Sequence, residues 1–234
     1  MVELDISDKN ISLYMANRQF VYALLARVYA EEPDETLKAI MCDDHSLEEL
    51  MLVQDEYSLE IASAYELCLH ALKLSPNSLS DLNQEYTRIF VGPETLKASP
   101  WELMHTTGKR VLFQPGVLEI RHSYREAGFL PQRYPDVSDD FIGLEYDFMA
   151  KLAARANKAY FDGCMTETYR ALKQSNSFLK DHILLWVDSL AEAIALNYGN
   201  GFYAAMTRIA YLYSKRDFRI VNELLEDFRL SGDC

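Results

Sequence analysis

The sequence is poor in the residues that interrupt helices, with 9 glycines and 7 prolines among 234 residues. The prolines fall between long segments of helical periodicity, and no useful length of sequence alternates apolar and polar residues. Hydrophobic residues make up 49% of the chain and aromatic residues 12%, which is enough for a packed core. The sequence therefore predicts an all-α globular protein.

Long apolar runs, a basic leader and paired cysteines are also lacking. No run of about 18 apolar residues is present, which argues against a membrane span. The first residues are acidic and are not followed by the apolar stretch of a signal peptide. The 4 cysteines are scattered without a Cys-x-x-Cys pair, and we expect reduced thiols. These features predict a cytoplasmic protein without membrane insertion.

Basic residues are in the minority, 23 against 36 acidic ones, and the formal net charge is −13. Nucleic-acid binding depends on lysine and arginine side chains that neutralise phosphates, so we expect no nucleic-acid partner. An anionic membrane surface is disfavoured for the same reason. An acidic surface serves either solubility, which is the commoner reason, or the attraction of a basic partner.

Motifs of catalysis and metal binding are absent from the sequence. No glutamate is followed three residues later by histidine, and the 5 histidines are dispersed. The chain also lacks a His-Glu-x-x-His motif, a Gly-x-Ser-x-Gly motif and a glycine-rich phosphate loop. We predict a protein that is not an enzyme, with no catalytic residues, no metal site and no cofactor.

Apolar periodicity predicts helices over residues 8–30, 34–41, 47–74, 79–90, 138–156, 164–196 and 202–228. Asp55 could divide the third of these, and a break is expected near residues 175–177 in the sixth. Residues 91–107 read as irregular, and Pro115-Gly116 as an interruption of a helical segment over 111–125. A connector at about 128–137 predicts a larger amino-terminal helical lobe, 1–134, and a smaller carboxy-terminal lobe, 135–234.

Three segments carry the most specific pattern in the chain. They are Glu85-Tyr-Thr-Arg-Ile-Phe-Val-Gly-Pro93, Ala98-Ser-Pro-Trp-Glu102 and Pro135-Asp-Val-Ser-Asp-Asp-Phe-Ile-Gly-Leu-Glu-Tyr-Asp-Phe-Met149. In this order and spacing they resemble the TorD/DmsD family of chaperones, which assist the maturation of exported molybdenum enzymes. The resemblance implies an all-helical bundle of the TorD type. Some members of that family exchange lobes to form dimers, so a monomer and a lobe-exchanged homodimer both remain open.

The resemblance also implies a peptide-binding site. Its candidate residues are Trp101, Glu102, Tyr124, Asp139, Asp140 and Phe141, and Phe141 stands where the family has histidine. The alternative for Trp101 is a loop anchor with Glu102 solvated beside it. For the two aspartates the alternative is capping of a helix that starts at Ser138. Structural roles are expected for Glu85, Phe90, Gly92, Pro93, Pro100 and Glu145, with Glu85 paired to Arg88 on a helix surface.

The function implied by the resemblance is that of a cytoplasmic chaperone. It would bind the twin-arginine signal peptide and the apo form of a molybdopterin-containing oxidoreductase, assist cofactor insertion and delay export. Carboxylates would engage the arginines of the signal peptide, while apolar contacts would supply most of the affinity. The alternative is an assembly adaptor of the NarJ type, which acts on the mature body of a redox-enzyme subunit without recognising a signal peptide.

Overall fold

The computed structural model describes residues 8–74, 77–92, 96–108, 115–131 and 137–230, and these residues form helices and no strand. The all-α prediction is confirmed. In chain order the helical elements are α1 (Asp8–Ala30), α2 (Glu35–Cys42), α3 (Asp44–Leu50), α4 (Ser58–Lys73), α5 (Ser78–Tyr86), the π-helix η1 (Thr87–Val91), α6 (Glu102–Thr106), α7 (Pro115–Glu126), α8 (Ile142–Phe161), α9 (Met165–Phe178), the π-helix η2 (Leu179–Ile183), α10 (Leu184–Tyr198) and α11 (Phe202–Leu230).

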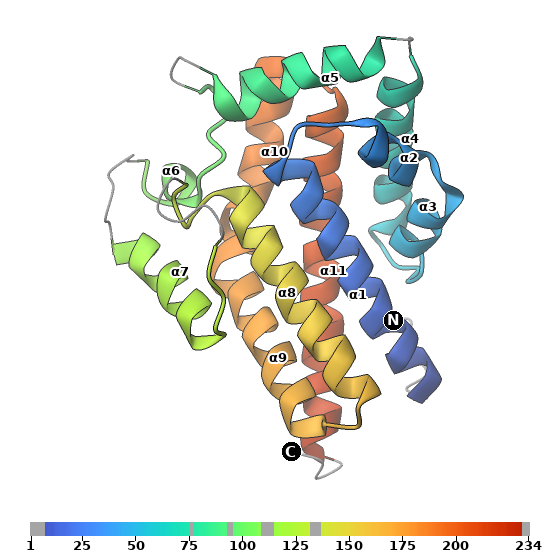
Figure 1. Ribbon diagram of the computed structural model, residues 1–234, viewed down its shortest axis with the longest axis vertical. Helices are drawn as coiled ribbons and strands as arrows, with labels where there is room; N and C mark the ends of the chain where they lie inside the picture. Colours follow the sequence, from blue (N-terminus) through green and yellow to red (C-terminus); the bar gives the residue numbers. More distant parts are fainter. Residues whose placement is uncertain (1–7, 75–76, 93–95, 109–114, 132–136, 231–234) are drawn as a thin grey trace.

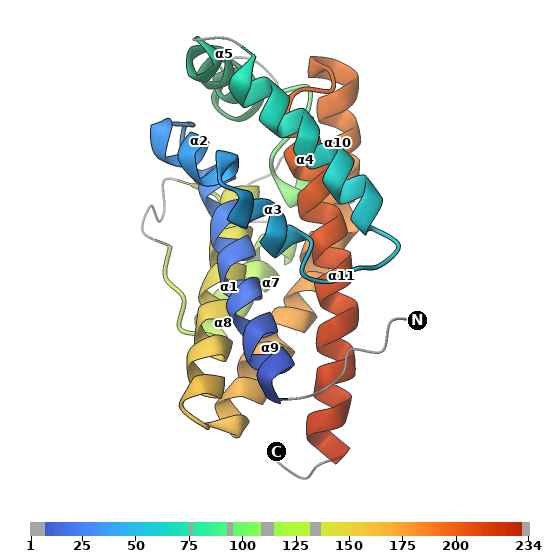
Figure 2. The same ribbon diagram turned by 90° about the vertical axis from the view of Figure 1, so that its right-hand side faces the viewer.

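The long helices α1, α8, α9 and α11 run along the length of the molecule (Figure 1). Helix α10 continues from α9 through η2, and α11 returns beside both. Helix α5 crosses one end of the bundle, while α2, α3 and α4 lie on one side and α7 on the other (Figures 1 and 2). None of the described helices combines the length and apolar composition that a membrane-spanning helix needs.

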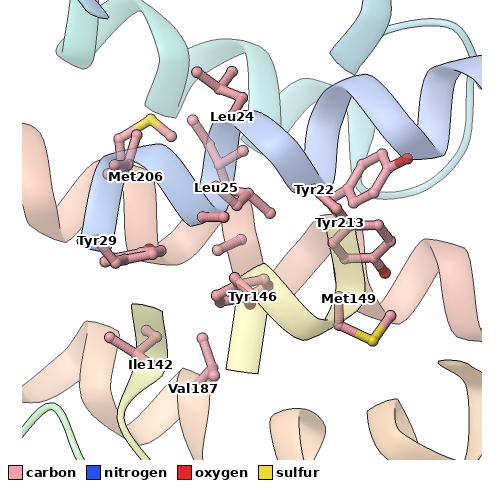
Figure 3. Close-up of a cluster of buried hydrophobic side chains, with 14 of the residues drawn as sticks. Tyr22, Leu24, Leu25, Tyr29, Ile142, Tyr146, Met149, Val187, Met206 and Tyr213 are labelled. Atoms are coloured by element: carbon pink, nitrogen blue, oxygen red, sulfur yellow. The ribbon is translucent and has the colours of Figure 1, made fainter. Parts of the chain in front are cut away.

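The core lies where α1, α8 and α11 meet, and it is rich in tyrosine (Figure 3). Tyr29 of α1 stacks on Tyr146 of α8, with ring centroids 5.6 Å apart. Tyr22 of α1 meets Tyr213 of α11 edge to face at 5.5 Å. One cluster of buried side chains thus joins residues on both sides of the predicted lobe boundary. The division into lobes 1–134 and 135–234 stays a prediction, and residues 132–136 of its connector lie outside the described residues.

The ends of several helices follow from single residues. The Asp34 carboxylate accepts the Leu37 backbone N–H at 2.8 Å and caps α2. Helix α10 ends at Gly199, whose φ of 89° lies in the left-handed region that glycine adopts without strain. The predicted split near Asp55 is present, because α3 ends at Leu50 and α4 begins at Ser58.

Several predicted helix boundaries are wrong. Helix α8 begins at Ile142 and not at Ser138, because the Ser138 hydroxyl donates to the Asp140 side chain and residues 138–141 form a turn. Pro115-Gly116 opens α7 where an interruption was expected, since proline suits the first turn of a helix. The break in 164–196 falls at η2, after Ser177, and residues 91–107 contain the short helix α6.

Glu85 has a different partner from the one predicted. It does not form an ion pair with Arg88; its Oε1 lies 3.5 Å from the Tyr203 backbone N in the first turn of α11. A Cβ at Gly201 would come within 2.9 Å of this carboxylate, so glycine leaves room for it. Burial raises the pKa of Glu85. Phe90 is buried against Tyr203, with ring centroids 5.1 Å apart, and so has the structural place expected for it.

A fully buried ion pair ties three of the long helices together. Arg18 Nε of α1 donates to Asp217 Oδ1 of α11 at 2.7 Å, and Arg18 Nη2 donates to Ser175 Oγ of α9 at 2.9 Å. The hydroxyls of Tyr14 and Tyr22 donate to the two Asp217 oxygens at 2.6 and 2.7 Å. Burial and the Asp217 charge raise the pKa values of both tyrosines, so the phenols remain donors.

Replacing Asp217 with asparagine should lower the free energy of unfolding by about 3–5 kcal/mol, because the buried Arg18 charge loses its counter-ion. The matched control is Asp162→Asn, which breaks an exposed pair with Lys158 and should cost less than about 1 kcal/mol. Urea unfolding at neutral pH measures both. Equal effects of the two substitutions would show that the buried pair does not stabilise the bundle.

Candidate functional site

The two motif regions predicted to form the site meet in space. The Ile142 backbone N–H donates to the Pro100 carbonyl at 3.0 Å, and the Glu102 N–H donates to the Asp140 carbonyl at 3.0 Å. These bonds form an isolated antiparallel bridge between Trp101 and Phe141, whose ring centroids lie 6.3 Å apart. Both rings are half-buried. The loop before α6 and the turn before α8 therefore present an aromatic pair at the surface.

The adjacent aspartates are buried beneath this pair, and each has a partner within the chain. Asp140 Oδ2 accepts the Leu103 N–H at 3.3 Å in the first turn of α6, and burial raises the pKa of Asp140. Asp139 Oδ2 accepts Arg121 Nε of α7 at 2.7 Å. An arginine of a bound peptide would have to displace Arg121 to reach Asp139. The geometry of Asp140 follows the capping alternative, although the helix that it caps is α6.

Tyr124 is buried as well, and it lies behind the aspartates. Its hydroxyl donates to the Asp139 carbonyl at 2.9 Å, and its ring packs on Phe148 with centroids 4.8 Å apart. Helix α7 ends at Glu126, and Gly128, with φ of 68°, lies in the turn that follows. Tyr124 therefore holds α7 against the turn that precedes α8.

Glu102 is not solvated beside Trp101, as the loop-anchor alternative expected, because it belongs to a buried polar cluster. His182 Nδ1 of η2 lies 3.1 Å from Glu102 Oε2. Glu145 of α8 accepts the Trp186 indole N–H at 3.1 Å through Oε2, and its Oε1 is buried without a hydrogen-bond partner among the described residues. Burial, and then the Glu102 charge, raise the pKa of Glu145 well above its usual range. This environment therefore favours the neutral form of Glu145.

The remaining structural residues surround this cluster. Pro100 is buried and supplies the carbonyl that receives Ile142. The Gly92 N–H donates to the Thr87 carbonyl at 2.7 Å and ends η1, whereas Pro93 lies outside the described residues. Within the described part of the chain, no group of three or more His, Cys, Asp and Glu side chains could hold a metal ion.

A groove of about 710 Å³ opens beside Phe141, between α1, α8 and residues 127–130. We call it the α1–α8 groove. Its charged lining consists of Arg27, Glu31, Asp147, Lys151 and Arg155, and the rest of its lining is mainly apolar. The apolar residues are Ala23, Ala26, Ala30, Ala127, Phe129, Leu130, Val137, Phe141, Leu144, Phe148, Ala150 and Leu152. A volume of this size and an apolar lining with a few charges are typical of binding sites.

Small residues line the groove where α1 and α8 approach each other. A Cβ at Gly143 would come within 2.6 Å of the Phe141 ring and 3.2 Å of the Ala30 Cα, so only glycine allows α1 and α8 to approach here. Leu130 at the rim exposes 81% of its surface. The groove therefore combines a close approach of α1 and α8 at Gly143 with an exposed apolar side chain at Leu130.

Asp147 is the carboxylate in the groove with the weakest partner. Its Oδ1 lies 3.9 Å from Lys151 Nζ, and burial raises its pKa despite that charge. Glu31, in contrast, pairs with Arg27 at 3.2 Å. Neither carboxylate is among the site residues predicted from the sequence. The position of Asp147 could have been inferred from helical spacing. It lies four residues from both Gly143 and Lys151, so the three share one face of α8. The buried residues Ile142, Tyr146 and Met149 lie on another face.

Replacing Glu145 with glutamine should remove a pH dependence of stability. Because folding raises the pKa of Glu145, its contribution is complete below the unfolded pKa of about 4.3 and is lost as pH rises towards the folded value. The loss reaches about 1.4 kcal/mol for each pH unit. Glutamine stays neutral, so the variant should gain stability relative to the native protein between pH 5 and 8 in urea unfolding. Exposed Glu126→Gln is the control, and equal slopes for the two variants would contradict a raised pKa of Glu145 in the folded protein.

The chain is similar in sequence to proteins of a known family. The family described as "Nitrate reductase delta subunit" matches residues 54–192, which is more than half of the chain. The Vibrio cholerae "Chaperone protein TorD" is 23% identical over 175 residues, covering 74% of this chain and 77% of that protein.

Two relatives carry the name DmsD. The Salmonella typhi "Tat proofreading chaperone DmsD" is 24% identical over 200 residues, covering 82% of this chain and 86% of that protein. The Haemophilus influenzae "Probable Tat proofreading chaperone DmsD" is 24% identical over 126 residues, covering 54% and 55%. The resemblance predicted from the three motif segments is confirmed, and the protein belongs to the nitrate reductase delta subunit family, together with the TorD and DmsD chaperones.

Proposed function

We propose that this protein is a cytoplasmic chaperone that binds the twin-arginine signal peptide and the apo form of a molybdopterin-containing oxidoreductase. The observation that carries the proposal is the α1–α8 groove, where apolar walls and carboxylates lie together beside Phe141. The relatives named TorD and Tat proofreading chaperone DmsD support the same client class. By holding the precursor, the protein delays export until the cofactor has been inserted.

The apolar part of the groove suits the hydrophobic region of a signal peptide. Such a segment, taken up as a helix or an extended strip, buries its side chains against Phe141, Leu144 and Leu130. Burial of apolar surface contributes roughly 25 cal/mol per Å², so these contacts supply most of the affinity.

The carboxylates suit the two arginines that precede the hydrophobic region. Asp147 is half-buried with a lysine at 3.9 Å, and a guanidinium can replace that weak contact with a bidentate one. Glu31 stands across the groove on the α1 side and adds negative charge. The groove lining as a whole holds three basic side chains against two acidic ones, so preference for the arginines rests on the local contact with Asp147. The net charge of −13 on the whole protein speeds the encounter with a basic peptide.

The peptide-binding residues predicted from sequence fall into two groups in this proposal, those partly exposed at the surface and those buried beneath it. Phe141 touches the peptide directly, and Trp101 extends the aromatic surface beside it. The buried residues Glu102, Tyr124, Asp139 and Asp140 hold that pair in place through contacts within the chain. The protein acts by binding alone and carries out no catalysis.

A second candidate is the assembly adaptor of the NarJ type, which acts on the mature body of a redox-enzyme subunit. The description of the matching family, nitrate reductase delta subunit, favours it. The two functions differ in whether an isolated signal peptide binds.

The Asp147→Asn substitution should weaken binding of a twin-arginine leader peptide about fivefold, because a half-buried charge pair is lost. Calorimetric titration uses a synthetic twin-arginine leader peptide with its hydrophobic region, and a version with both arginines changed to lysine. The matched control Asp162→Asn lies at the end of α8, outside the groove, and should leave affinity unchanged. Binding of neither peptide to the folded protein would favour the adaptor function.

Loss of aromatic surface should weaken the same peptide more than loss of a buried carboxylate. We expect Phe141→Ala to weaken binding tenfold or more, because it removes a groove wall, and Trp101→Ala to weaken it by less. Glu102→Gln keeps the shape of the buried cluster and should change affinity less than twofold. The same titrations measure all three variants. A Glu102→Gln effect larger than that of Phe141→Ala would show that charge, and not apolar capture, leads the recognition.

A further inference from the structure

Positive charge is concentrated on one part of this acidic protein. Residues 148–180, in α8, α9 and η2, contain 6 of the 23 basic residues and 2 of the 36 acidic ones. The basic side chains are Lys151, Arg155, Lys158, Arg170, Lys173 and Lys180. Lys151 and Arg155 line the α1–α8 groove, whereas Lys173 and Lys180 lie on α9 and η2, away from it. The two lysines are therefore available to a ligand of opposite sign from a signal peptide.

A second groove, of about 410 Å³, lies within this region between α9 with η2 and the last turns of α11. We call it the α9–α11 groove. Lys173, Lys180 and Arg229 line it, and none of the three has a carboxylate of the described residues within ion-pair distance. Among the described residues, Glu226 is the one acidic side chain in the lining, so these residues give the groove an excess of two positive charges.

Two basic side chains of the groove, on α9 and η2, are spaced along the helix axis at an interval that suits an extended peptide. Lys173 and Lys180 are seven residues apart on one helical face, about 10 Å along the axis. An extended chain covers that length in about three residues, so a short segment with two acidic side chains reaches both lysines. Half-buried Phe218 and Leu225 of α11 supply apolar contacts opposite them.

A buried amide in the lining indicates what else the ligand offers. Asn176 is 7% exposed, and its Nδ2 donates to Asn222 Oδ1 at 2.7 Å. Its Oδ1 is buried and has no hydrogen-bond partner within the described part of the chain, and both asparagines line the groove. A buried acceptor left without a donor costs about 1–3 kcal/mol, which a ligand N–H would recover. A peptide backbone provides such an N–H, whereas inorganic phosphate at neutral pH is chiefly an acceptor.

We propose that the α9–α11 groove binds an acidic peptide segment of a partner protein, with its carboxylates on Lys173, Lys180 and Arg229 and a backbone N–H on Asn176. The site lies on a different pair of helices from the α1–α8 groove and shares no lining residue with it. The protein therefore has two grooves of different preference, one for a basic apolar segment and one for an acidic segment. The inference does not depend on signal-peptide recognition.

Fluorescence anisotropy with the full chain tests this site. The probe is a short fluorescein-labelled peptide in which Glu alternates with Ala and Leu, compared with its Gln counterpart. The Glu probe should bind saturably and at least tenfold more tightly than the Gln probe. The triple variant Lys173→Gln, Lys180→Gln, Arg229→Gln should weaken binding roughly tenfold, since each rim contact contributes a few-fold. Asn176→Ala should weaken binding of both probes.

The control variant Lys9→Gln, Lys38→Gln, Lys73→Gln removes the same charge from α1, α2 and α4, outside the groove. It should change affinity less than twofold. Equal weakening by both triple variants would overturn the proposal in favour of a general charge effect. Displacement of the probe by millimolar inorganic phosphate would overturn it in favour of a simple anion site. A dimer seen by sedimentation that only the groove variant abolishes would make the occupant a second copy of this chain.

Discussion

The buried ion pair between Arg18 and Asp217 is the constraint on which the rest of the structure depends. Its charges have left water completely, so they are stable only while α1, α9 and α11 keep the register that joins them. Helix α1 forms one wall of the α1–α8 groove, and α9 and α11 form the second groove. A single polar cluster in the middle of the bundle therefore fixes the geometry of both surfaces.

The aromatic surface depends on a second buried cluster. The loop before α6 reaches the start of α8 through two backbone hydrogen bonds, and these bring Trp101 beside Phe141. Beneath them, burial and the Glu102 charge raise the pKa of Glu145, which favours its neutral form and lessens the repulsion between the two side chains. The cluster joins α6, α8, η2 and α10, so Glu102, which the sequence predicts as a peptide ligand, supports the aromatic surface from beneath.

Much of the fold was predictable because helix formation leaves local signals. The bounds of α1, the cap at Asp34 and the end of α10 at Gly199 follow from periodicity and from the backbone preferences of Asp and Gly. The start of α8 was not predictable in the same way, because Ser138 bonds to the Asp140 side chain and not to a helix backbone. The π-helix η2 was also missed, since no local residue pattern distinguishes it from α-helix.

The sequence by itself determined the helical class, the family and the two segments that meet at the site, because these depend on composition, periodicity and short motifs. Only the tertiary structure decided which acidic residues are available to a ligand. Asp139, Asp140 and Asp147 are the same type of residue, and nothing in the sequence ranks their exposure. Packing of α6 and α7 buries the first two, whereas Asp147 lines the groove. Burial depends on neighbours that are distant in the chain, and a sequence motif carries no record of them.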